Sequence, residues 1–509
     1  MAHADVFRTP LHSELSTNSI DHALPTISRL PPELLAHVFA LYVEDATARD
    51  AQSALRWVGI THVSRRWRQV ALQDHSLWRR IPFRSGQRWA DEFVIRSGPM
   101  PLEVSLEYDQ AWNPVWPAHL LVKHFPRVER LLLRDKDPSL ARSDVGLLDQ
   151  PAPSLVSLSI QTIATTRFNL PLRPFDDHAP CLRHISIRRC PRFPWTSPVL
   201  RNLVSLRVAL VATVHPPSST EVLDAVRQMA SLEELALLGD LPRFSRRMEL
   251  PPPPIPTIEL PRLRSLELQG YLHDCAGIIQ PLRVPATATL HLSARWEGPA
   301  AEMRVLFPLL AAGGWFAAPC PFVTFWSSAD DNFAVSARRA AATGAQGADL
   351  DVVLQLFWED ARSEWSSFDC MKAVTEALFV PKDLLDLQLF VHPAWTPDAW
   401  AALFHGAERM RAVGVDRYSG PALFRALAEH GGEEAPFLPR LCSMRISMVV
   451  LEMGRDGVLE RTDAGRNLFA CLKVRAEHGA PIETLSMFKC RVEGCVEDLK
   501  KIVPFVECL

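Results

Sequence analysis

Long apolar runs are missing from this sequence of 509 residues. A membrane-spanning helix needs about 18 or more consecutive, mostly apolar residues, and no window of the sequence provides them. The first stretch, MAHADVFRTPLHSELSTNSIDHALP, also lacks the basic start and continuous apolar run that mark a secretory signal. We therefore expect neither export nor a membrane partner.

An excess of positive charge is missing as well. The chain carries 55 Lys and Arg against 58 Asp and Glu, a net charge of -3, whereas nucleic-acid-binding proteins normally have a basic excess that neutralises phosphates. No cysteine precedes Cys181, and the ten cysteines are scattered as far as Cys508 without the dense spacing of disulfide scaffolds. These features predict no nucleic-acid partner, and reduced thiols in the cytoplasm or nucleus.

Motifs for catalysis or cofactor binding are also absent from the sequence. It has no Gly-rich phosphate loop, no nucleophile elbow and no H-E-x-x-H helix. Cys490 and Cys495 are five residues apart, with only Cys508 beyond them and no histidine after His478 to complete a zinc site. We expect no catalytic residue, no cofactor and no metal. An enzyme whose pocket is assembled from distant side chains stays open as an alternative.

The segment VHPAWTPDAW has two interpretations. Four of its side chains could line a pocket: His392, Trp395, Asp398 and Trp400. A helix start is the simpler interpretation, because Thr396 suits the capping position, Pro397 the first helical position and Asp398 the first turn. We favour the helix start.

Three apolar stripes at helical spacing lie between residues 30 and 81. In chain order they are Leu34, Leu35, Val38, Phe39 and Tyr42; Trp57, Ile60, Val63, Trp67 and Val70; and Leu77, Trp78 and Ile81. Two prolines followed by Glu33 suit a helix N-terminus, because proline there forfeits only an unpaired amide and the carboxylate faces the positive end of the helix dipole. Three short helices cannot bury all of this surface internally, so we expect part of it to meet a partner.

Three blocks within residues 28–83 together resemble the F-box family. They are LPPELL, then HVSRRWRQVA, then SLWRRI, in the order of the family pattern LPxELL, VCRxWRxLA and LW. Ser64 stands where the pattern has Cys, and the interval between the first two blocks is longer than in the shortest family members. This longer interval resembles F-box proteins of mushroom-forming fungi.

The resemblance implies docking onto the Skp-family adaptor of a cullin-RING ubiquitin ligase. The positions that match the family's docking blocks are Leu30, Pro31, Pro32, Glu33, Leu34, Val38, Phe39, Val63, Trp67, Leu77 and Trp78. Leu35, Val63 and Trp67 could each equally belong to the module's own core, because amphipathic helices usually turn their apolar face inward.

A short pattern with apolar residues at its first, fourth and sixth positions recurs after residue 100. Its copies begin at Val128, Leu155, Leu182, Leu203, Leu232, Leu263, Leu384, Met410, Leu441 and Ile482. Their spacing brackets the roughly 20–29 residues of leucine-rich repeats, and alternation within each copy predicts a short parallel strand. Between about 270 and 380 the pattern weakens to ATLHLSA, FVTFWSS and DVVLQLFW, which indicate strands in degenerate or inserted repeats. Cys190 and Cys490 occupy the slot where these repeats prefer Asn or Cys, so we expect both side chains to turn inward.

Together these patterns predict an α/β chain with a three-helix F-box module followed by a leucine-rich-repeat-like solenoid of short parallel strands. The expected division is a flexible leader at 1–27, the F-box module at 28–83, a connecting segment at 84–124 and an irregular array at 125–509. We expect a non-catalytic receptor whose F-box binds the adaptor, and through it cullin, while the array binds an unknown protein target. The alternative is an interaction scaffold in which the F-box-like helices only cap the array, since repeat arrays need such caps.

Overall fold

The chain forms two compact units, Met1–Met100 and Pro101–Leu509. The computed structural model describes residues 27, 30–49, 55–108, 115–135, 145–162, 170–211, 217–244, 256–296, 303–312, 315, 319–327, 332–339, 352–358, 367–391, 395–430, 436–452, 463–493 and 496–509. The predicted leader at 1–27 lies outside these residues except for Ile27. Within these ranges, no helix is both long enough and apolar enough to cross a membrane.

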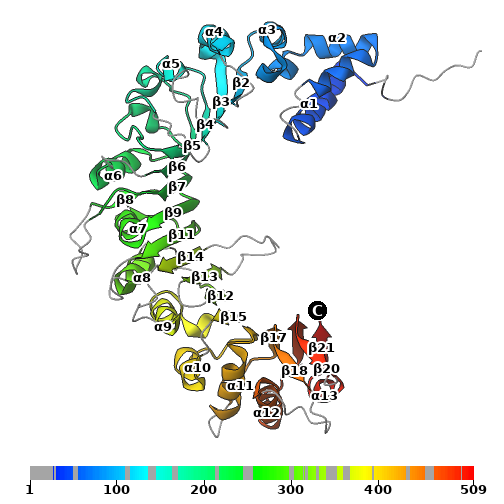
Figure 1. Ribbon diagram of the computed structural model, residues 1–509, viewed down its shortest axis with the longest axis vertical. Coiled ribbons are helices and arrows are strands. Elements are labelled where there is room, and N and C mark those ends of the chain that lie inside the picture. Colours follow the sequence, from blue (N-terminus) through cyan, green and yellow to red (C-terminus); the bar gives the residue numbers. More distant parts are fainter. Residues whose placement is uncertain are drawn as a thin grey trace, which may run out of the picture. The chain divides into compact units, whose positions relative to one another are not determined.

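The N-terminal unit consists of short helices (Figure 1). They are α1 (Pro32–Arg49), a 3-10 helix (Arg56–His62), α2 (Arg65–Gln73), two further 3-10 helices (His75–Trp78 and Phe83–Ser85) and α3 (Gln87–Arg96), with a two-residue strand β1 (Arg80–Ile81). The predicted second helix is wrong as one continuous element. Ser64 is extended, with φ of -157°, and its hydroxyl accepts a hydrogen bond from the Trp67 amide at 3.1 Å. A serine cap of this kind starts a new helix, so the stripe from Trp57 to Val70 is divided between two helices.

An aromatic cluster forms the centre of this unit. The rings of Trp57, Trp78 and Phe93 lie pairwise 5.0, 5.8 and 4.8 Å apart and meet edge to face, the arrangement that aromatic quadrupoles favour. The buried Trp78 indole donates to the Ala71 carbonyl at 2.8 Å, and the Arg96 guanidinium lies 4.9 Å from the Trp78 ring centroid. Residues 84–124, expected to connect the two regions, therefore include α3, which completes this core, as well as β2 and α4.

A long, mostly parallel sheet forms the C-terminal unit (Figure 1). In the order in which they pair, the strands of this unit are β2 (Leu102–Tyr108), β3 (Val128–Asp135), β4 (Ser157–Thr162), β5 (His184–Cys190), β6 (Ser205–Leu210), β7 (Glu234–Gly239), β9 (Ser265–Tyr271), β11 (Thr289–Trp296), β14 (Val352–Trp358), β13 (Asn332–Arg338), β12 (Phe322–Ser327), β15 (Asp386–Val391), β16 (Ala412–Asp416), β17 (Ser443–Ser447), β19 (Thr484–Phe488) and β21 (Phe505–Cys508). Two short parallel pairs accompany it, β8 (Ile258–Glu259) with β10 (Leu282–Arg283) and β18 (Val450–Glu452) with β20 (Arg491–Glu493).

The recurring apolar pattern places the strands. Each of the ten copies coincides with a strand, so the strand predictions are confirmed. Neighbouring copies pair in parallel within each of two series, from Val128 to Leu263 and from Leu384 to Ile482. In the copy from Leu155, for example, Leu155 is buried just before β4, while Leu158 and Ile160 are buried within it. The period of two in a strand sends these side chains to one face, and the residues between them point to the other face.

Helices cover the face that receives the apolar side chains (Figure 1). They are α4 (Val115–His124), α5 (Val145–Leu148), α6 (Ser219–Gln228), α7 (Leu272–Ile279), α8 (Met303–Ala312), α9 (Ser367–Leu378), α10 (Pro397–Phe404), α11 (Gly420–Glu429), α12 (Asp463–Glu477) and α13 (Val496–Lys500). We call the opposite face of the sheet, formed by the alternate strand residues, the open face.

The TPDAW segment starts α10, as predicted. The Thr396 hydroxyl accepts from the Ala399 amide at 3.2 Å, and Pro397 is the first helical residue. Trp395 and Trp400 are buried with their rings 5.5 Å apart, so they pack in the core. His392 lies outside the described residues.

The two cysteines expected to turn inward differ. Cys190 is fully buried, and burial raises the pKa of its thiol to about 11, whereas Cys490 is only half-buried. The residues before them, Arg189 and Lys489, have positive φ values of 60° and 51°. Arg189 lies within β5, where the register with β6 shifts, whereas Lys489 follows the end of β19, and only the first brings its cysteine fully inside.

The regular order of strands breaks between β11 and β15. The three weakly patterned segments do form strands, but β13 was not predicted, and it runs antiparallel to both of its neighbours, β14 and β12. The chain passes from β11 to β12, which pairs with the later β15, and returns through β13 to β14, which pairs with β11. This region is therefore a three-strand excursion whose order in space is the reverse of its order in the chain.

Candidate functional site

Helix α1 has two apolar stripes on neighbouring faces. Leu35, Phe39 and Val43, spaced four residues apart, are buried. Leu34, Val38, Leu41 and Tyr42 are 53%, 42%, 54% and 43% exposed, although the same helical spacing places them along one face. We call these four residues the α1 stripe. A soluble helix normally covers its apolar face, so the α1 stripe is a candidate for covering by another protein.

The buried face of α1 packs on α2. The Phe39 and Trp67 rings are 5.1 Å apart, and the Trp67 amide is the one that the Ser64 hydroxyl caps. The Arg66 guanidinium donates to the Leu30 carbonyl at the entry to α1. Val63, immediately before this cap, is 61% exposed. The N-terminus of α2 thus fixes α1 and leaves an apolar side chain in solvent beside the junction.

The eleven positions carried over from the family pattern divide into three groups. Those exposed to solvent are Pro31, Pro32, Glu33, Leu34, Val38 and Val63. Those half-buried are Leu30 and Trp67. Those buried in the unit's own core are Phe39, Leu77 and Trp78. The exposed group can contact another molecule directly, whereas the buried group can act only by holding the helices in place.

Two contributions to this site were missed by sequence reasoning. Leu41 belongs to the α1 stripe, and its spacing of seven residues from Leu34 could have revealed it. Phe93 belongs to the core, and the amphipathic run QRWADEFVIR that contains it begins just beyond the predicted module boundary. Extending the helical pattern past residue 83 would have found this helix.

The comparison with protein families agrees with this geometry. A family model described as F-box-like matches residues 27–84. The chain carries an F-box-like domain. The match covers α1, α2 and the first two 3-10 helices and ends within the third, before α3, which the structure adds to the core of the same unit. No curated protein matches the chain at a significant level.

The open face of the C-terminal sheet is a second candidate surface, and the strand residues that form it are mostly polar. Ion pairs cross it from strand to strand. Arg134 on β3 pairs with Glu107 on β2 at 2.8 Å, and Arg207 on β6 reaches over β7 to Glu267 on β9 at 2.7 Å. The residue beneath the second bridge is Ala236, which is buried by it. A small residue on the middle strand thus lets an arginine span two strands.

The same device occurs near the other end of the sheet. Arg445 on β17 pairs with Asp386 on β15 by passing over Gly414 on β16. A Cβ at Gly414 would lie 3.2 Å from Gln388 and 3.7 Å from Arg445, so a larger side chain would compete with the bridge for space. Small residues on the middle strands therefore make room for the arginines that bridge the open face.

Proposed function

We propose that this protein is the substrate-recognition subunit of an SCF-type ubiquitin ligase. In this proposal the F-box-like domain docks on a Skp-family adaptor, and through it on cullin, in the cytoplasm or nucleus. The C-terminal unit, an irregular leucine-rich-repeat-like solenoid, holds a protein target. The observation that carries the proposal is the exposed α1 stripe inside the segment that matches the F-box family model.

The docking step needs no chemistry. The α1 stripe residues are about half exposed, and covering each of them would stabilise a complex by roughly 1 kcal/mol, about half the value for a fully exposed side chain. Four such side chains together with Val63 provide a free energy appropriate to reversible assembly. The buried Phe39, Leu77 and Trp78 hold this surface rigid, so little order has to be gained on binding.

The receptor role is geometric and not catalytic. A target held by the C-terminal unit and a ligase held by the N-terminal unit are joined through one chain, which raises the effective concentration of a target lysine near the transferred ubiquitin. The ion-paired open face supports this role, because it offers a patterned polar surface to a protein target. Binding a target there requires no catalytic residues.

Adaptor capture tests the docking site. We expect the double substitution Leu34→Asp and Val38→Asp to weaken capture of a Skp-family adaptor at least about 100-fold, since two charges would be buried without partners. The matched control is Ile95→Asp on α3, because Ile95 is 72% exposed and apolar but lies outside the matched segment. The control should bind within threefold of the unchanged chain, and both variants should keep the same melting temperature. Full adaptor capture by the double variant would refute the docking site.

The same double variant tests target holding. It should still bind the target but no longer deliver it to the ligase, so the target should not be degraded. Proteins that the variant labels by proximity in cells should therefore become more abundant when the variant is expressed. Suppose that the unchanged chain captures the adaptor normally but the turnover of the labelled proteins does not change. This result would favour a scaffold over a ligase receptor.

A further inference from the structure

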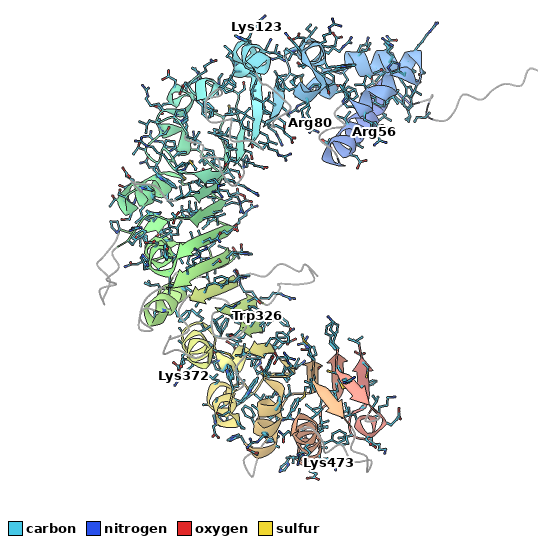
Figure 2. The ribbon with its side chains drawn as sticks, viewed as in Figure 1. Arg56, Arg80, Lys123, Trp326, Lys372 and Lys473 are labelled. Carbon is cyan, nitrogen blue, oxygen red and sulfur yellow. The ribbon has the colours of Figure 1, made fainter. Side chains whose placement is uncertain are left out.

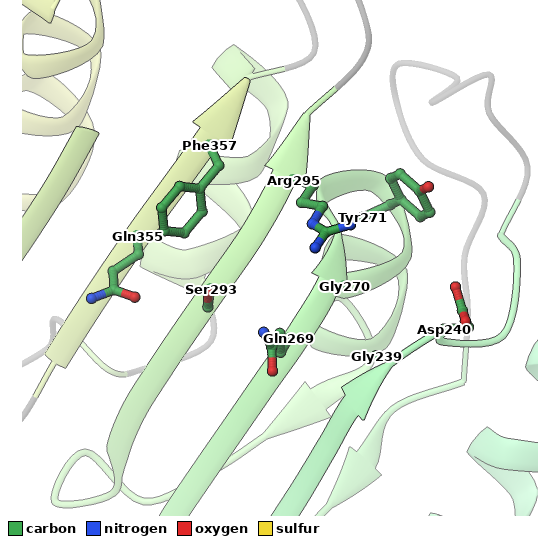
Figure 3. Close-up of a pocket in the computed structure, with 9 residues that line it drawn as sticks. All are labelled: Gly239, Asp240, Gln269, Gly270, Tyr271, Ser293, Arg295, Gln355 and Phe357. Carbon is green, nitrogen blue, oxygen red and sulfur yellow. The ribbon is translucent and has the colours of Figure 1, made fainter. Parts of the chain in front are cut away.

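The open face is hollowed where β7, β9, β11 and β14 reach their carboxyl ends. The hollow has a volume of about 680 Å³ (Figure 3). It is lined by Gly239, Asp240, Gln269, Gly270, Tyr271, Ser293, Arg295, Gln355 and Phe357. It is large enough for side chains of an extended peptide and stays open to solvent on the side away from the helices.

Two cross-strand rows build the hollow. In one row Arg295 stands between Tyr271 and Phe357, and in the other Ser293 stands between Gln269 and Gln355. The short serine in the middle leaves space between the two amides. Arg295 is therefore flanked by one aromatic residue on each neighbouring strand, and its own side chain is exposed.

Glycine forms the floor beside these rows. A Cβ at Gly270 would lie 2.9 Å from the Gly239 carbonyl oxygen and from Leu241. Gly239 has a φ of +88°, and a Cβ there would lie 2.2 Å from the Leu210 carbonyl oxygen. Only glycine fits both positions.

Arg295 differs from the other arginines of the open face that were described above. Arg134, Arg207 and Arg445 each pair with a carboxylate, whereas Arg295 has no ion-pair partner within the described ranges. Asp240 also lines the hollow but follows β7, which β9 separates from β11, roughly 10 Å away at about 4.8 Å per strand. The guanidinium is therefore available for an incoming carboxylate.

An exposed aromatic side chain lies on the row of Ser293, three strands beyond β11. The row continues from Gln355 through Ala334 to Trp326 and Phe390. Trp326 on β12 is 45% exposed and is labelled in Figure 2. The small Ala334 leaves one side of its indole open, so Trp326 and the half-buried Phe390 present an apolar contact next to the polar hollow.

We propose that an extended target segment crosses the open face from β9 to β12, with an acidic side chain bound by Arg295 and a large apolar side chain bound by Trp326. β11 and β12 are three strand spacings apart, or about 14 Å, which an extended chain covers in about four to five residues at roughly 3.3 Å each. The recognised feature is therefore an acidic residue followed or preceded, about four or five positions away, by a large apolar residue. This inference rests on the proposed function, in which the C-terminal unit holds a protein target, and it adds the chemistry of that target.

Peptide selection on the full chain tests the proposal. The probe is a display library of random peptides of about 12 residues, long enough to span the hollow and Trp326. Selected peptides should share an acidic and a large apolar residue at this spacing. Charge-assisted hydrogen bonds to a carboxylate are the strong ones, so Arg295→Gln should weaken binding of a selected peptide about tenfold. Trp326→Ala should weaken it by a similar factor.

Two controls make the outcome decisive. Arg409→Gln removes the same charge from an exposed arginine outside the open-face strands and should leave binding within twofold. Replacing the peptide's acidic residue by its amide should cost about tenfold on the unchanged chain but nothing on Arg295→Gln. Selection of peptides without an acidic preference, no selection at all, or equal binding by Arg295→Gln would overturn the proposal. Adaptor capture, measured on the same preparations, reports separately on the proposed ligase role.

Discussion

The two units of this protein treat apolar side chains in opposite ways. In the N-terminal unit, α1 carries apolar residues on two neighbouring faces and buries only one of them. In the C-terminal unit, strand alternation sends the leucines of each repeat under the helices, and the open face is crossed by ion pairs. The first unit is thus left with an apolar surface to be covered, and the second with a polar surface to be matched.

The difference follows from geometry more than from composition. A helix with adjacent apolar residues such as Leu34 and Leu35 points them about 100° apart, and the short neighbouring helices cover only one of these directions. A strand separates adjacent residues completely, because successive side chains point to opposite faces. An apolar surface such as the α1 stripe suits a partner that is always the same. The polar residues of the open face can change without disrupting the core beneath them.

The largest expected effect in this comparison comes from the N-terminal core. Trp78→Ala removes a buried ring, its contacts with Trp57 and Phe93 and its hydrogen bond to Ala71, and should cost about 3–5 kcal/mol. Val38→Ala, in the α1 stripe, should cost less than about 0.5 kcal/mol. Hydrogen exchange of the α2 and α3 amides measures both effects, and exchange in the C-terminal unit serves as the internal reference. Equal costs for the two substitutions would show that the buried and exposed faces of this unit are not distinct.

Sequence reasoning found the strands because each copy of the pattern is local. The apolar residues at Leu263, Leu266 and Leu268 specify a strand from their own spacing, and parallel pairing with the preceding copy follows from the repeat. The position of β13 was not predictable in this way. Its alternating residues Phe333, Val335 and Ala337 are a weak signal, and its pairing with β12 and β14 depends on the reversed order of three strands, which no local spacing encodes.

The same limit applies to the candidate sites. Helical spacing grouped Leu34 with Leu35 and Phe39, but it could not say which face the unit would cover for itself. Trp78 and Leu34 were therefore both predicted to contact the adaptor, but Trp78 is buried and Leu34 is exposed. The neighbourhood of Arg295 and Trp326 was also hidden, because these residues are brought together only by the excursion of β12 through β14.

A somewhat smaller effect is expected at a buried charge in the C-terminal unit. Arg475 on α12 is fully buried and donates to the carbonyl oxygens of Phe437, Leu438 and Leu441 at 2.7, 3.0 and 3.0 Å. Burial lowers the pKa of its guanidinium, and the three acceptors compensate part of that cost. Arg475→Met leaves them without this donor and should cost about 3 kcal/mol.

The measurement is again hydrogen exchange, now in α12 and residues 436–441. Protection there should fall for Arg475→Met and stay the same for Arg409→Met, because Arg409 is exposed. Protection of α2 and α3 should be unchanged in both. If the N-terminal unit also lost protection, the two units would not be independent, and the comparison between them would have to be replaced by a single cooperative fold.

The smallest effect is expected on the open face. Arg207 and Glu267 are 47% and 35% exposed, so solvent screens their attraction, and a double-mutant cycle of Arg207→Ala and Glu267→Ala should give a coupling of about 0.5 kcal/mol. Hydrogen exchange of the β7 amides, which lie beneath the bridge, measures the single and double variants. A coupling above about 2 kcal/mol would mean that the bridge holds the sheet together. A small coupling means instead that charged residues on this face can be substituted with little loss of stability in the core below. A surface adapted to one particular target requires this property.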